Sequence, residues 1–371
     1  MYGDHKYRRL PDIRQDNQDN YLDLSSNDYL SMSSNEEVLE SGIEAARKYG
    51  FGATGSRLLS GNNELFQNLE NLIAKDKHTE SALIFSTGFQ ANTSVLASLL
   101  DEKVFLANPI VFFDKLNHSS LYQAVFSTKA ELIRYNHNDM IQLEYLMDKY
   151  KHDTRPKFIV AETIFGMDGD ILPIEDVVTL AKQHHAFLYL DEAHATGIFG
   201  PSGYGLSTTI DLSEIEHVIM GSFSKALGCS GGYIACSEIL QNYLINKSAG
   251  FIYSTAPSPA VMGAVYKSWD MLRYLNDQRC NLLNLGNYLR EKLLKHDFDI
   301  GKSTTHIVPI ILKKDEIVLK AKETLLKHKI IVSAIRPPTV PPNSSRLRIA
   351  LNTKHRNEDV DRLIEILVNI R

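Results

Sequence analysis

Four reactive side chains follow two apolar runs in the middle of the chain. The first run, residues 187–190, stops at Asp191, with His194 shortly after it; the second ends at Ser222, which Lys225 follows. Continuous apolar residues bounded by polar ones indicate strands buried on both faces, as in parallel sheets. Because ligands of open α/β sheets bind beyond the carboxyl ends of the strands, we expect these four side chains to share one site.

An acid, an imidazole and an amine gathered in this way suit a cofactor with a ring cation and a carbonyl group. Pyridoxal 5'-phosphate has both, and proteins hold it with a lysine Schiff base, an aspartate at the pyridinium nitrogen and hydroxyl or backbone N–H groups at the phosphate. A solvated surface position is the commoner place for a lysine, but Lys225 lies among small residues after an apolar run. The sequence therefore predicts this cofactor.

Two short motifs in this region also occur in other classes of protein. Asp191-Glu-Ala-His194 matches the acidic box of some nucleotide-driven helicases, which also need the phosphate loop G-x-x-x-x-G-K-[ST]. Gly301-Lys302-Ser303 lacks the upstream glycine of that loop. Ser222-Phe-Ser-Lys225 matches the S-x-x-K motif of penicillin-recognising enzymes, but their S-D-N and K-T-G motifs are absent. We reject both interpretations.

The bulk properties fit a globular enzyme. A chain of 371 residues can bury a large core and form two domains. Its net charge of −5 favours neither nucleic acid nor a membrane as the main partner. The three cysteines form no C-x-x-C pair, which is typical of reduced thiols in a cytoplasmic protein. No stretch reaches the roughly 20 apolar residues of a membrane span.

Apolar periodicity predicts strands that alternate with helices from residue 80 onward, after a helix over 36–49 that Asn35 caps. The expected strands are 82–85, 111–113, 130–133, 158–161, 187–190 and 233–236. The expected helices are 90–100, 139–150 and 174–184, with 258–297 mostly helical. This alternation implies an α/β fold with a doubly wound, mostly parallel sheet. The tail, 307–370, reads strand–helix–strand–strand–helix.

We expect three parts along the chain: an arm and small-domain segment (1–40), a large cofactor domain (41–260) and a small C-terminal α+β domain (261–371). In the large part, a helix beginning after Gly88 would offer free N–H groups and a positive dipole end to a phosphate. The glycine-rich stretch 50–57 is a flexible loop or a loop close to a ligand. His118, taken alone, is more often structural. No spaced set of residues resembles a zinc site, so we expect no metal.

Together these motifs resemble the α-oxoamine synthases, pyridoxal-phosphate transferases of the aspartate-aminotransferase fold (fold type I). The resemblance covers nearly the whole chain, from Tyr21 to the last helix. It is carried by five stretches: Ser25-Ser-Asn-Asp-Tyr-Leu30, Asp168-Gly-Asp170, Asp191 to His194, Lys225 and Ile252-Tyr-Ser-Thr255. The proline-rich run 334–341 resembles the members of the family that act in biotin synthesis.

The resemblance implies a role for each matching residue. Lys225 anchors the cofactor, Asp191 pairs with the ring nitrogen, His194 bonds the ring hydroxyl and His118 stacks on the ring, so these four are the catalytic residues. The cofactor-binding residues are Gly88, Phe89, His118, Asp191, His194, Ser222, Lys225 and Thr255. The substrate-binding residues are Asn27, His118, Thr339, Arg348 and one of Arg8 and Arg9, with Arg348 as the clamp on the amino-acid carboxylate.

Two departures from the family pattern stand out. Gly166 occupies a position where the family usually has serine, so one cofactor hydrogen bond is missing or supplied by another group. The N-terminal arm is shorter than usual, which leaves open whether Arg8 or Arg9 meets the far end of the acyl chain.

The reaction implied is the decarboxylative condensation of L-alanine with a pimeloyl thioester of coenzyme A or of an acyl carrier protein. The alternatives are a glycine C-acetyltransferase, another α-oxoamine synthase, or a non-catalytic regulator with the cofactor fold. The resemblance also implies a homodimer in which residues 251–257 reach the neighbouring subunit's phosphate site. Read alone, Ser254-Thr255 before Pro257 would be a helix N-cap.

Overall fold

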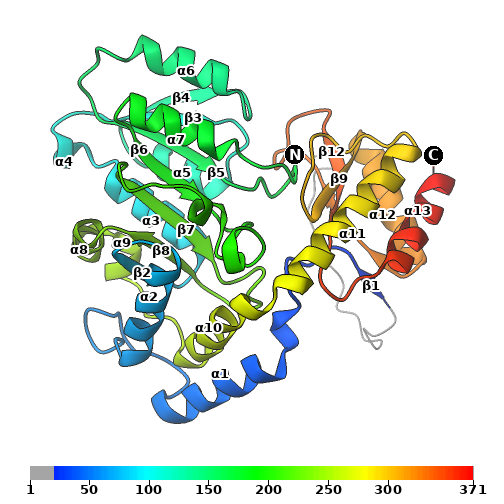
Figure 1. Ribbon diagram of the computed structural model, residues 1–371, viewed down its shortest axis with the longest axis horizontal. Helices are drawn as coiled ribbons and strands as arrows, with labels where there is room; N and C mark the ends of the chain where they lie inside the picture. The colour runs from blue at the N-terminus through cyan, green and yellow to red at the C-terminus, as the bar shows by residue number, and fades with distance from the viewer. Residues whose placement is uncertain (1–20, 371) are drawn as a thin grey trace, which may run out of the picture. The chain divides into compact units, whose positions relative to one another are not determined.

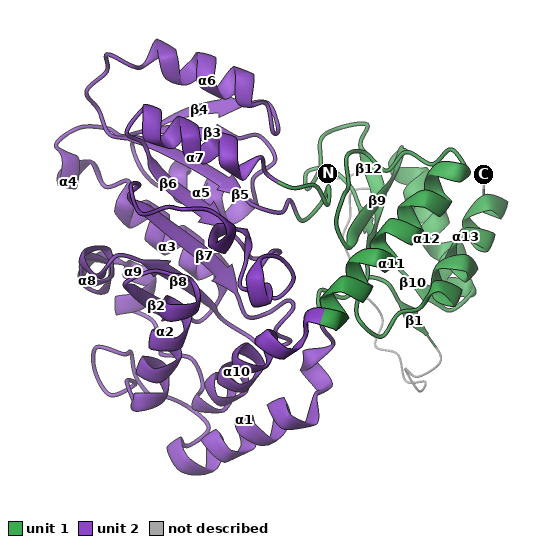
Figure 2. Ribbon diagram, viewed as in Figure 1, with its two compact units in different colours: residues 1–29, 166–171, 277–371 green, residues 30–165, 172–276 purple. Residues whose placement is uncertain are grey.

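The computed structural model describes residues 21–370, which form two compact units (Figures 1 and 2). Unit 1 contains residues 21–29, 166–171 and 277–370, and unit 2 contains 30–165 and 172–276. Unit 2 therefore begins earlier and ends later than the large domain expected over 41–260.

The reason is the packing of two helices within unit 2, α1 (Glu36–Tyr49) and α10 (Pro259–Met271). Small residues let them approach closely: a Cβ on Gly263 would lie only 2.4 Å from the Cβ of Ala45. The Ser41 hydroxyl also donates to the carbonyl of Gly263, at 2.9 Å. Because each helix buries one face against the other, neither can belong to a separate unit.

Unit 2 is built on a seven-stranded sheet in the order β2-β8-β7-β6-β5-β3-β4. The strands are β2 (Ser81–Phe85), β3 (Ile110–Asp114), β4 (Glu131–Tyr135), β5 (Lys157–Glu162), β6 (Phe187–Asp191), β7 (His217–Ser222) and β8 (Gly232–Cys236). Five neighbouring strands, β7 to β4 in that order, are parallel, and β8 runs antiparallel between β7 and β2. The expected mostly parallel α/β fold is confirmed.

Helices cover both faces of this sheet (Figure 1). Besides α1 and α10, the helices of unit 2 are α2 (Glu64–Asp76), α3 (Gly88–Leu99), α4 (Glu102–Phe105), α5 (Ser119–Phe126), α6 (Met140–Lys149), α7 (Ile174–Gln183), α8 (Glu238–Lys247) and α9 (Ala249–Ile252). Helix α3 packs against β7 and β8, and α7 packs against β6. Strand β6 is buried on both faces, as its continuous apolar run predicted, because the successive side chains of Leu188, Tyr189 and Leu190 are all fully buried.

Side-chain caps fix where several of these helices begin. The Asn35 side chain accepts from the N–H of Val38 at the start of α1, which confirms the predicted cap. The Thr87 hydroxyl accepts from the N–H of Gln90 at the start of α3. Each cap satisfies one of the backbone donors that a helix leaves open in its first turn.

Unit 1 gathers segments that are far apart in the sequence. Strand β1 (Leu22–Asp23) pairs in parallel with β10 (Ile330–Ile331), and β11 (Ser333–Ile335), β12 (Ser345–Ala350) and β9 (Ile307–Lys313) form an antiparallel sheet. The helices of this unit are α11 (Asn276–Lys295), most of which belongs to it, α12 (Asp315–Lys327) and α13 (Asn357–Ile370).

A glycine secures the packing of the segment 166–171 in unit 1. Gly169 has a φ of +70°, and a Cβ there would lie 1.9 Å from the carbonyl oxygen of Ile307. Only glycine allows this approach without displacing the backbone. Across the described residues, no helix is both long and apolar enough to span a membrane. The three cysteines, Cys229, Cys236 and Cys280, are free thiols.

A buried ion pair joins α2 to the segment that follows β6. The Lys77 ammonium contacts the carboxylate of Glu192, and both side chains are fully buried. Glu192 also accepts from the backbone N–H and the hydroxyl of Ser207, at 2.8 and 2.9 Å. Because Glu192 directly follows Asp191, this pair anchors the chain where the sequence predicts the site.

We predict that Lys77→Met destabilises the protein by about 3–5 kcal/mol, because it leaves the Glu192 carboxylate buried without its cation. Lys48→Met is the matched control, since Lys48 forms an ion pair with Glu64 that is exposed on both sides. It should change stability little. Chemical unfolding of the two variants measures this difference, and equal effects would contradict the role given to the buried pair.

Candidate active site

The carboxyl ends of three parallel strands, β3, β6 and β7, bring several of the predicted cofactor residues to one edge of the unit 2 sheet. Asp191 is the last residue of β6, and Ser222 is the last residue of β7. His118 follows β3 by a short turn, and Lys225 follows β7. The pKa of His118 responds to the opposite charges of Asp191, which raises it, and Lys225, which lowers it, so both charged groups lie near the imidazole.

The start of α3 forms the second part of this edge. Its first residue, Gly88, lies against β7, because a Cβ on Gly88 would be 3.4 Å from the Cβ of Ser222. A Cβ on Gly232 would in turn lie 2.7 Å from the Cα of Gly88. Small residues therefore keep the backbone open around the first turn of a twelve-residue helix, where N–H groups and the helix dipole favour a phosphate.

The environment of Asp191 fits a cationic ring nitrogen. The residue is 4% exposed, and its carboxylate accepts from the N–H of Ala193 at 2.9 Å and from Asn92 Nδ2 at 2.7 Å. Within the described chain these hydrogen-bond partners are neutral, so the negative charge is available to a cation. A buried charge of this kind is costly unless it is paired. The residues thus fit pyridoxal phosphate in both charge and position.

A second carboxyl group, which the sequence did not single out, lies beside Asp191. Glu162 ends β5, and its backbone is the register partner of Asp191 in β6. Burial, together with the charge of Asp191, raises the pKa of Glu162 well above its ordinary value, although Lys225 opposes the shift. Two neighbouring carboxyl groups with different protonation are a recurrent feature of active sites.

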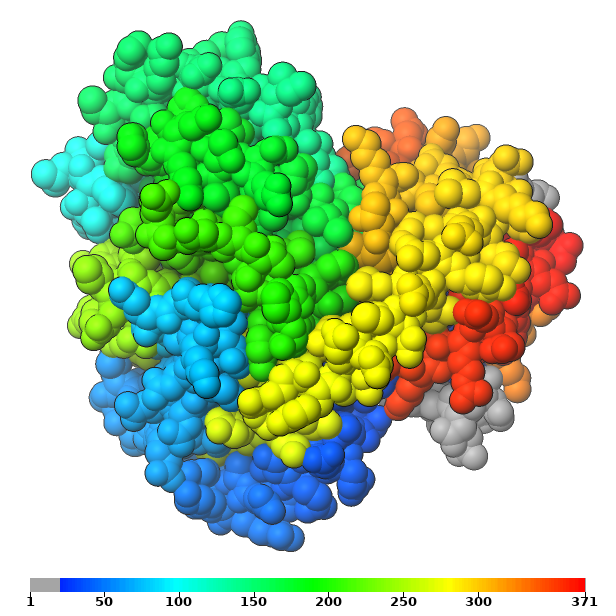
Figure 3. Space-filling model, viewed as in Figure 1, coloured from blue at the N-terminus to red at the C-terminus, as the bar shows by residue number. Residues whose placement is uncertain are grey.

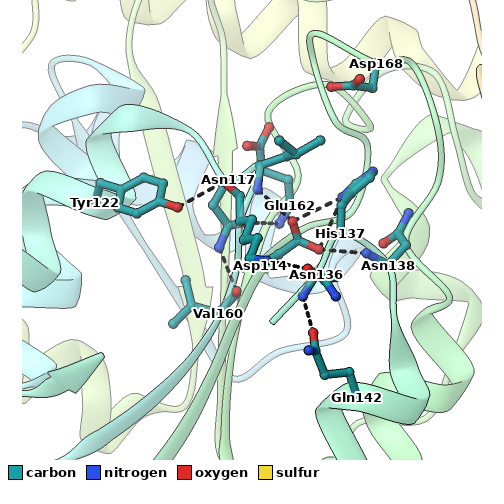
Figure 4. Close-up of polar contacts among 12 residues, drawn as sticks. Asp114, Asn117, Tyr122, Asn136, His137, Asn138, Gln142, Val160, Glu162 and Asp168 are labelled. Atoms are coloured by element: carbon teal, nitrogen blue, oxygen red, sulfur yellow. Dashed lines mark hydrogen bonds and ion pairs between the residues drawn. The ribbon is translucent and has the colours of Figure 1, made fainter. Parts of the chain in front are cut away.

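Hydrogen bonds to Asp114 hold the turn that carries His118 (Figure 4). The buried Asp114 carboxylate accepts from the N–H groups of Leu116 and Asn138 at 2.8 and 2.9 Å and contacts Nδ1 of His137 at 3.1 Å. Asn117 next to it donates to the carbonyl of Val160 on β5, at 2.7 Å.

The same turn is tied to Glu162 by two contacts. Asn117 accepts from the backbone N–H of Glu162 at 3.1 Å, and the Glu162 carboxyl accepts from the backbone N–H of His118. The position of His118 is therefore set by β3 and β5 together.

His118 itself caps α5. Its Nδ1 accepts from the backbone N–H of Ser120 at 3.3 Å and lies 2.7 Å from the Ser120 hydroxyl. Burial of the imidazole lowers the pKa of His118, Asp191 raises it, and Lys225 lowers it. The residue as a whole remains partly open to solvent, so its ring can cover a bound molecule.

A cluster within unit 1 surrounds Arg348. The buried Arg348 side chain donates to the carbonyl of Gly166, to Oδ1 of Asn27 at 3.0 Å and to the hydroxyl of Tyr29 at 3.2 Å. Its neighbour Arg346 instead contacts the carboxylate of Asp168, at 2.6 Å. Arg348 thus keeps its charge unpaired among the residues that the structure describes.

The remaining predicted residues differ in their exposure to solvent. His194 is 7% exposed in the turn after β6. Phe89 and Thr255 are exposed in unit 2, and Thr339 is exposed in unit 1. The alternative that Thr255 caps a helix is wrong, because α10 begins at Pro259 with Ser258 as its N-cap. Arg8 and Arg9 lie outside the described residues.

Sequence reasoning missed Asn92 and Ser120 as well as Glu162. Asn92 is 1% exposed on the apolar face of α3, between Ala91 and Val95. A polar residue within an apolar stripe of a helix is the sequence feature that could have identified Asn92 as a site residue. No cluster of possible metal ligands occurs among the residues described.

Comparisons with known proteins agree with this geometry. The sequence pattern of the family "Aminotransferase class I and II" matches residues 19–367, and the chain belongs to this family. A protein of Paramagnetospirillum magneticum named "Putative 8-amino-7-oxononanoate synthase" is 42% identical over 348 residues, which cover 94% of this chain and 88% of that protein.

Two solved structures are similar over the same length. A serine palmitoyltransferase from S. paucimobilis with a bound PLP–myriocin aldimine has a TM-score of 0.88 and 26% identity, covering 94% of this chain and 87% of that one. An 8-amino-7-oxononanoate synthase from Francisella tularensis has a TM-score of 0.81 and 26% identity, covering 95% and 98%.

These similarities define the class of enzyme. The protein is a transferase of fold type I whose cofactor is pyridoxal 5'-phosphate. Within that fold it is an enzyme of the α-oxoamine synthase class, as its motifs indicated.

We predict that Glu162→Gln removes a pH dependence of folding stability. Because burial raises the pKa of Glu162, the folded protein keeps a proton that the unfolded chain releases above about pH 4.3. The wild type therefore loses stability as pH rises through the window up to the raised pKa. The glutamine variant lacks this loss, so its advantage should grow with pH. Urea midpoints between pH 5 and 8 measure it.

Glu144→Gln, a matching change at an exposed position of α6, is the control. A constant difference between Glu162→Gln and the wild type over this pH range would show that Glu162 is ionised in the folded protein.

Proposed function

We propose that the enzyme is an 8-amino-7-oxononanoate synthase, which condenses L-alanine with a pimeloyl thioester in biotin biosynthesis. The observation that carries this proposal is the 42% identity to a protein of that name along 94% of the chain. The Francisella tularensis structure, which covers nearly all of both chains, supports the same choice.

The chain's own groups suit the steps of this reaction. Asp191 would hold a proton on the ring nitrogen, and His118 would cover one face of the ring. When bound, pyridoxal phosphate supplies the electron-accepting ring that stabilises negative charge on the alanine Cα. The Lys225 amine, released from the cofactor, takes the Cα proton as general base and later returns it. First-turn N–H groups of α3 and the Ser222 hydroxyl would bind the phosphate.

Arg348 is the proposed clamp on the carboxylate of the amino acid. Its three hydrogen bonds go to neutral oxygens, and a guanidinium has five N–H donors, so two donors and the full charge are available. Arg346 is already paired with Asp168, which supports the choice of Arg348. Asn27 would orient this clamp, since it accepts from Arg348 directly.

The atoms and protons of the reaction balance. A carbon–carbon bond forms between Cα of alanine and the thioester carbonyl carbon, and the carbon–sulfur bond breaks to release the thiolate, which takes a proton from water. The bond from Cα to the alanine carboxylate then breaks and releases carbon dioxide. The proton taken from Cα returns there, which leaves the nine-carbon amino ketone.

A second candidate is another α-oxoamine synthase with a different amino acid and acyl chain, including a glycine C-acetyltransferase. The TM-score of 0.88 to a serine palmitoyltransferase supports this possibility. The difference between the candidates lies in the substrates, because the cofactor and the lysine serve both.

We predict that L-alanine with a pimeloyl thioester gives a higher kcat/KM than glycine with an acetyl thioester or serine with a palmitoyl thioester. A panel of the three amino acids against thioesters of coenzyme A and of acyl carrier protein measures this preference. Lys225→Ala should bind the cofactor without covalent attachment and lose turnover with every pair. A higher kcat/KM for the glycine or serine pair would assign the protein to the second candidate.

We further propose a homodimer with shared sites. Large apolar side chains are exposed in unit 2, among them Phe51, Leu59 and Tyr253 at 81%, 83% and 85%. Phe51 also lines an apolar groove of about 590 Å³, together with α1, the start of α10 and the segment after Lys225. Figure 3 shows helix α1 in blue at the surface of the molecule. A second copy of the chain would bury these side chains and bring Thr255 to the neighbouring phosphate.

We predict that Lys225→Ala and Thr255→Ala complement each other when their subunits are mixed. Each variant alone should be impaired, since losing a hydrogen bond to a charged phosphate costs about 1.5–3 kcal/mol of cofactor binding. A hybrid dimer would have one doubly altered site and one intact site, so activity should return. An active monomer in sedimentation, or mixtures no better than the two variants alone, would contradict the shared site.

A further inference from the structure

The buried amide of Asn92 connects two parts of the candidate site. Its Oδ1 accepts from the hydroxyl of Tyr189 at 2.9 Å. Its Nδ2 donates to Asp191 Oδ2 at 2.7 Å and to Ser120 Oγ at 2.9 Å. A primary amide has two N–H donors, so both are in use. Asn92 lies on α3, whereas its three partners lie on β6 and α5, so one side chain joins three elements.

These contacts fix the direction of each hydrogen bond. A tyrosine hydroxyl can donate to the amide oxygen, and a carboxylate can only accept, so the nitrogen of the amide faces Asp191. Ser120 Oγ receives the second N–H of Asn92, and its own hydrogen is then free to point to His118 Nδ1, 2.7 Å away. The backbone N–H of Ser120 donates to the same nitrogen at 3.3 Å. Because a backbone N–H can only donate, Nδ1 is an acceptor and carries no proton, and the Ser120 hydroxyl then donates to it as well.

We infer that Asn92 and Ser120 are positioning residues that hold His118 as the neutral imidazole with its hydrogen on Nε2, and that couple this state to the orientation of Asp191. The roles of Asp191 and His118 toward the cofactor rest on the proposed function. The protonation of the imidazole follows from the hydrogen-bond directions alone.

The charged groups around His118 agree with a neutral ring. Burial and Lys225 lower the pKa of His118, and Asp191 raises it by a smaller effect than burial. The Glu162 carboxyl, on the neighbouring strand, accepts from the backbone N–H of His118, away from the ring nitrogens. Asp114, behind the turn, is occupied by the N–H groups of Leu116 and Asn138 and by His137.

The arrangement defines what His118 can do during turnover. With Nδ1 occupied as an acceptor, the ring presents Nε2–H as a hydrogen-bond donor, and it does not act as a base through Nδ1. Asp191 and His118 are held from the same amide, so movement of one is transmitted to the other. Asn92 and Ser120 act through these two residues and not on the substrate.

The first test is the nitrogen NMR spectrum of the holoenzyme labelled with ¹⁵N-histidine. Between pH 6 and 8, the two His118 signals, assigned by their absence in His118→Asn, should show a bare Nδ1 and a protonated Nε2. A proton on Nδ1 in the wild type would overturn the inference, whether or not any variant folds. Because this spectrum does not depend on turnover, an inactive protein with the expected signals would refute the proposed function and leave the inference standing.

The second test uses Ser120→Ala, with Ser119→Ala as control at the adjacent exposed position. Loss of the Oγ donor should raise the pKa of His118 by about half to one pH unit, the net worth of one hydrogen bond. The acid limb of kcat/KM against pH should move up equally in Ser120→Ala and not in Ser119→Ala. Ser120→Thr, which restores a hydroxyl, should reverse the shift. Identical NMR titrations for Ser120→Ala and Ser119→Ala would refute the assignment to Ser120.

Discussion

The buried carboxylate of Asp191 is the constraint on which the rest of unit 2 depends. A charge that is 4% exposed must be surrounded by donors, because an unpaired buried ion is strongly destabilising. The backbone of Ala193 and the amide of Asn92 supply two of them. The amide in turn needs Tyr189 and Ser120 as partners. One charge at a strand end thus dictates polar residues on α3 and α5, both otherwise apolar toward the core.

Two other buried carboxyl groups near Asp191, those of Glu192 and Glu162, are also stabilised, but by other means. Glu192 is buried with Lys77 as its cation, whereas burial raises the pKa of Glu162 and so favours its protonated form. The three carboxyl groups are therefore accommodated differently: neutral donors surround Asp191, a buried cation pairs with Glu192, and burial favours a proton on Glu162. The carboxylate of Asp191 thus fits the ring cation of pyridoxal phosphate.

Local signals in the sequence predicted much of the fold. The Asn35 cap, the buried strand β6 and the helix after Gly88 each depend on residues within a few positions of one another, and all were confirmed. The position of β8 between β7 and β2 was not predictable, because strand order depends on distant pairing. Likewise the first of the two adjacent strands expected in the tail divides between two sheets, as β10 and β11. Asn92 was not predicted as a site residue, because all its hydrogen-bond partners are distant in sequence.

The pairing of β1 with β10 has a consequence for synthesis on the ribosome. Leu22 finds its partner, Ile330, only after some three hundred further residues have been added. Unit 2 ends at residue 276, so its sheet can form while unit 1 still lacks four of the five strands described in it, β9 to β12. Contacts between distant segments form slowly, because a long loop must close first. Residues 21–29 therefore leave the ribosome long before their partners in unit 1 have been made. Because few of these residues are apolar, such as Leu22 and Leu24, little apolar surface is exposed in the meantime.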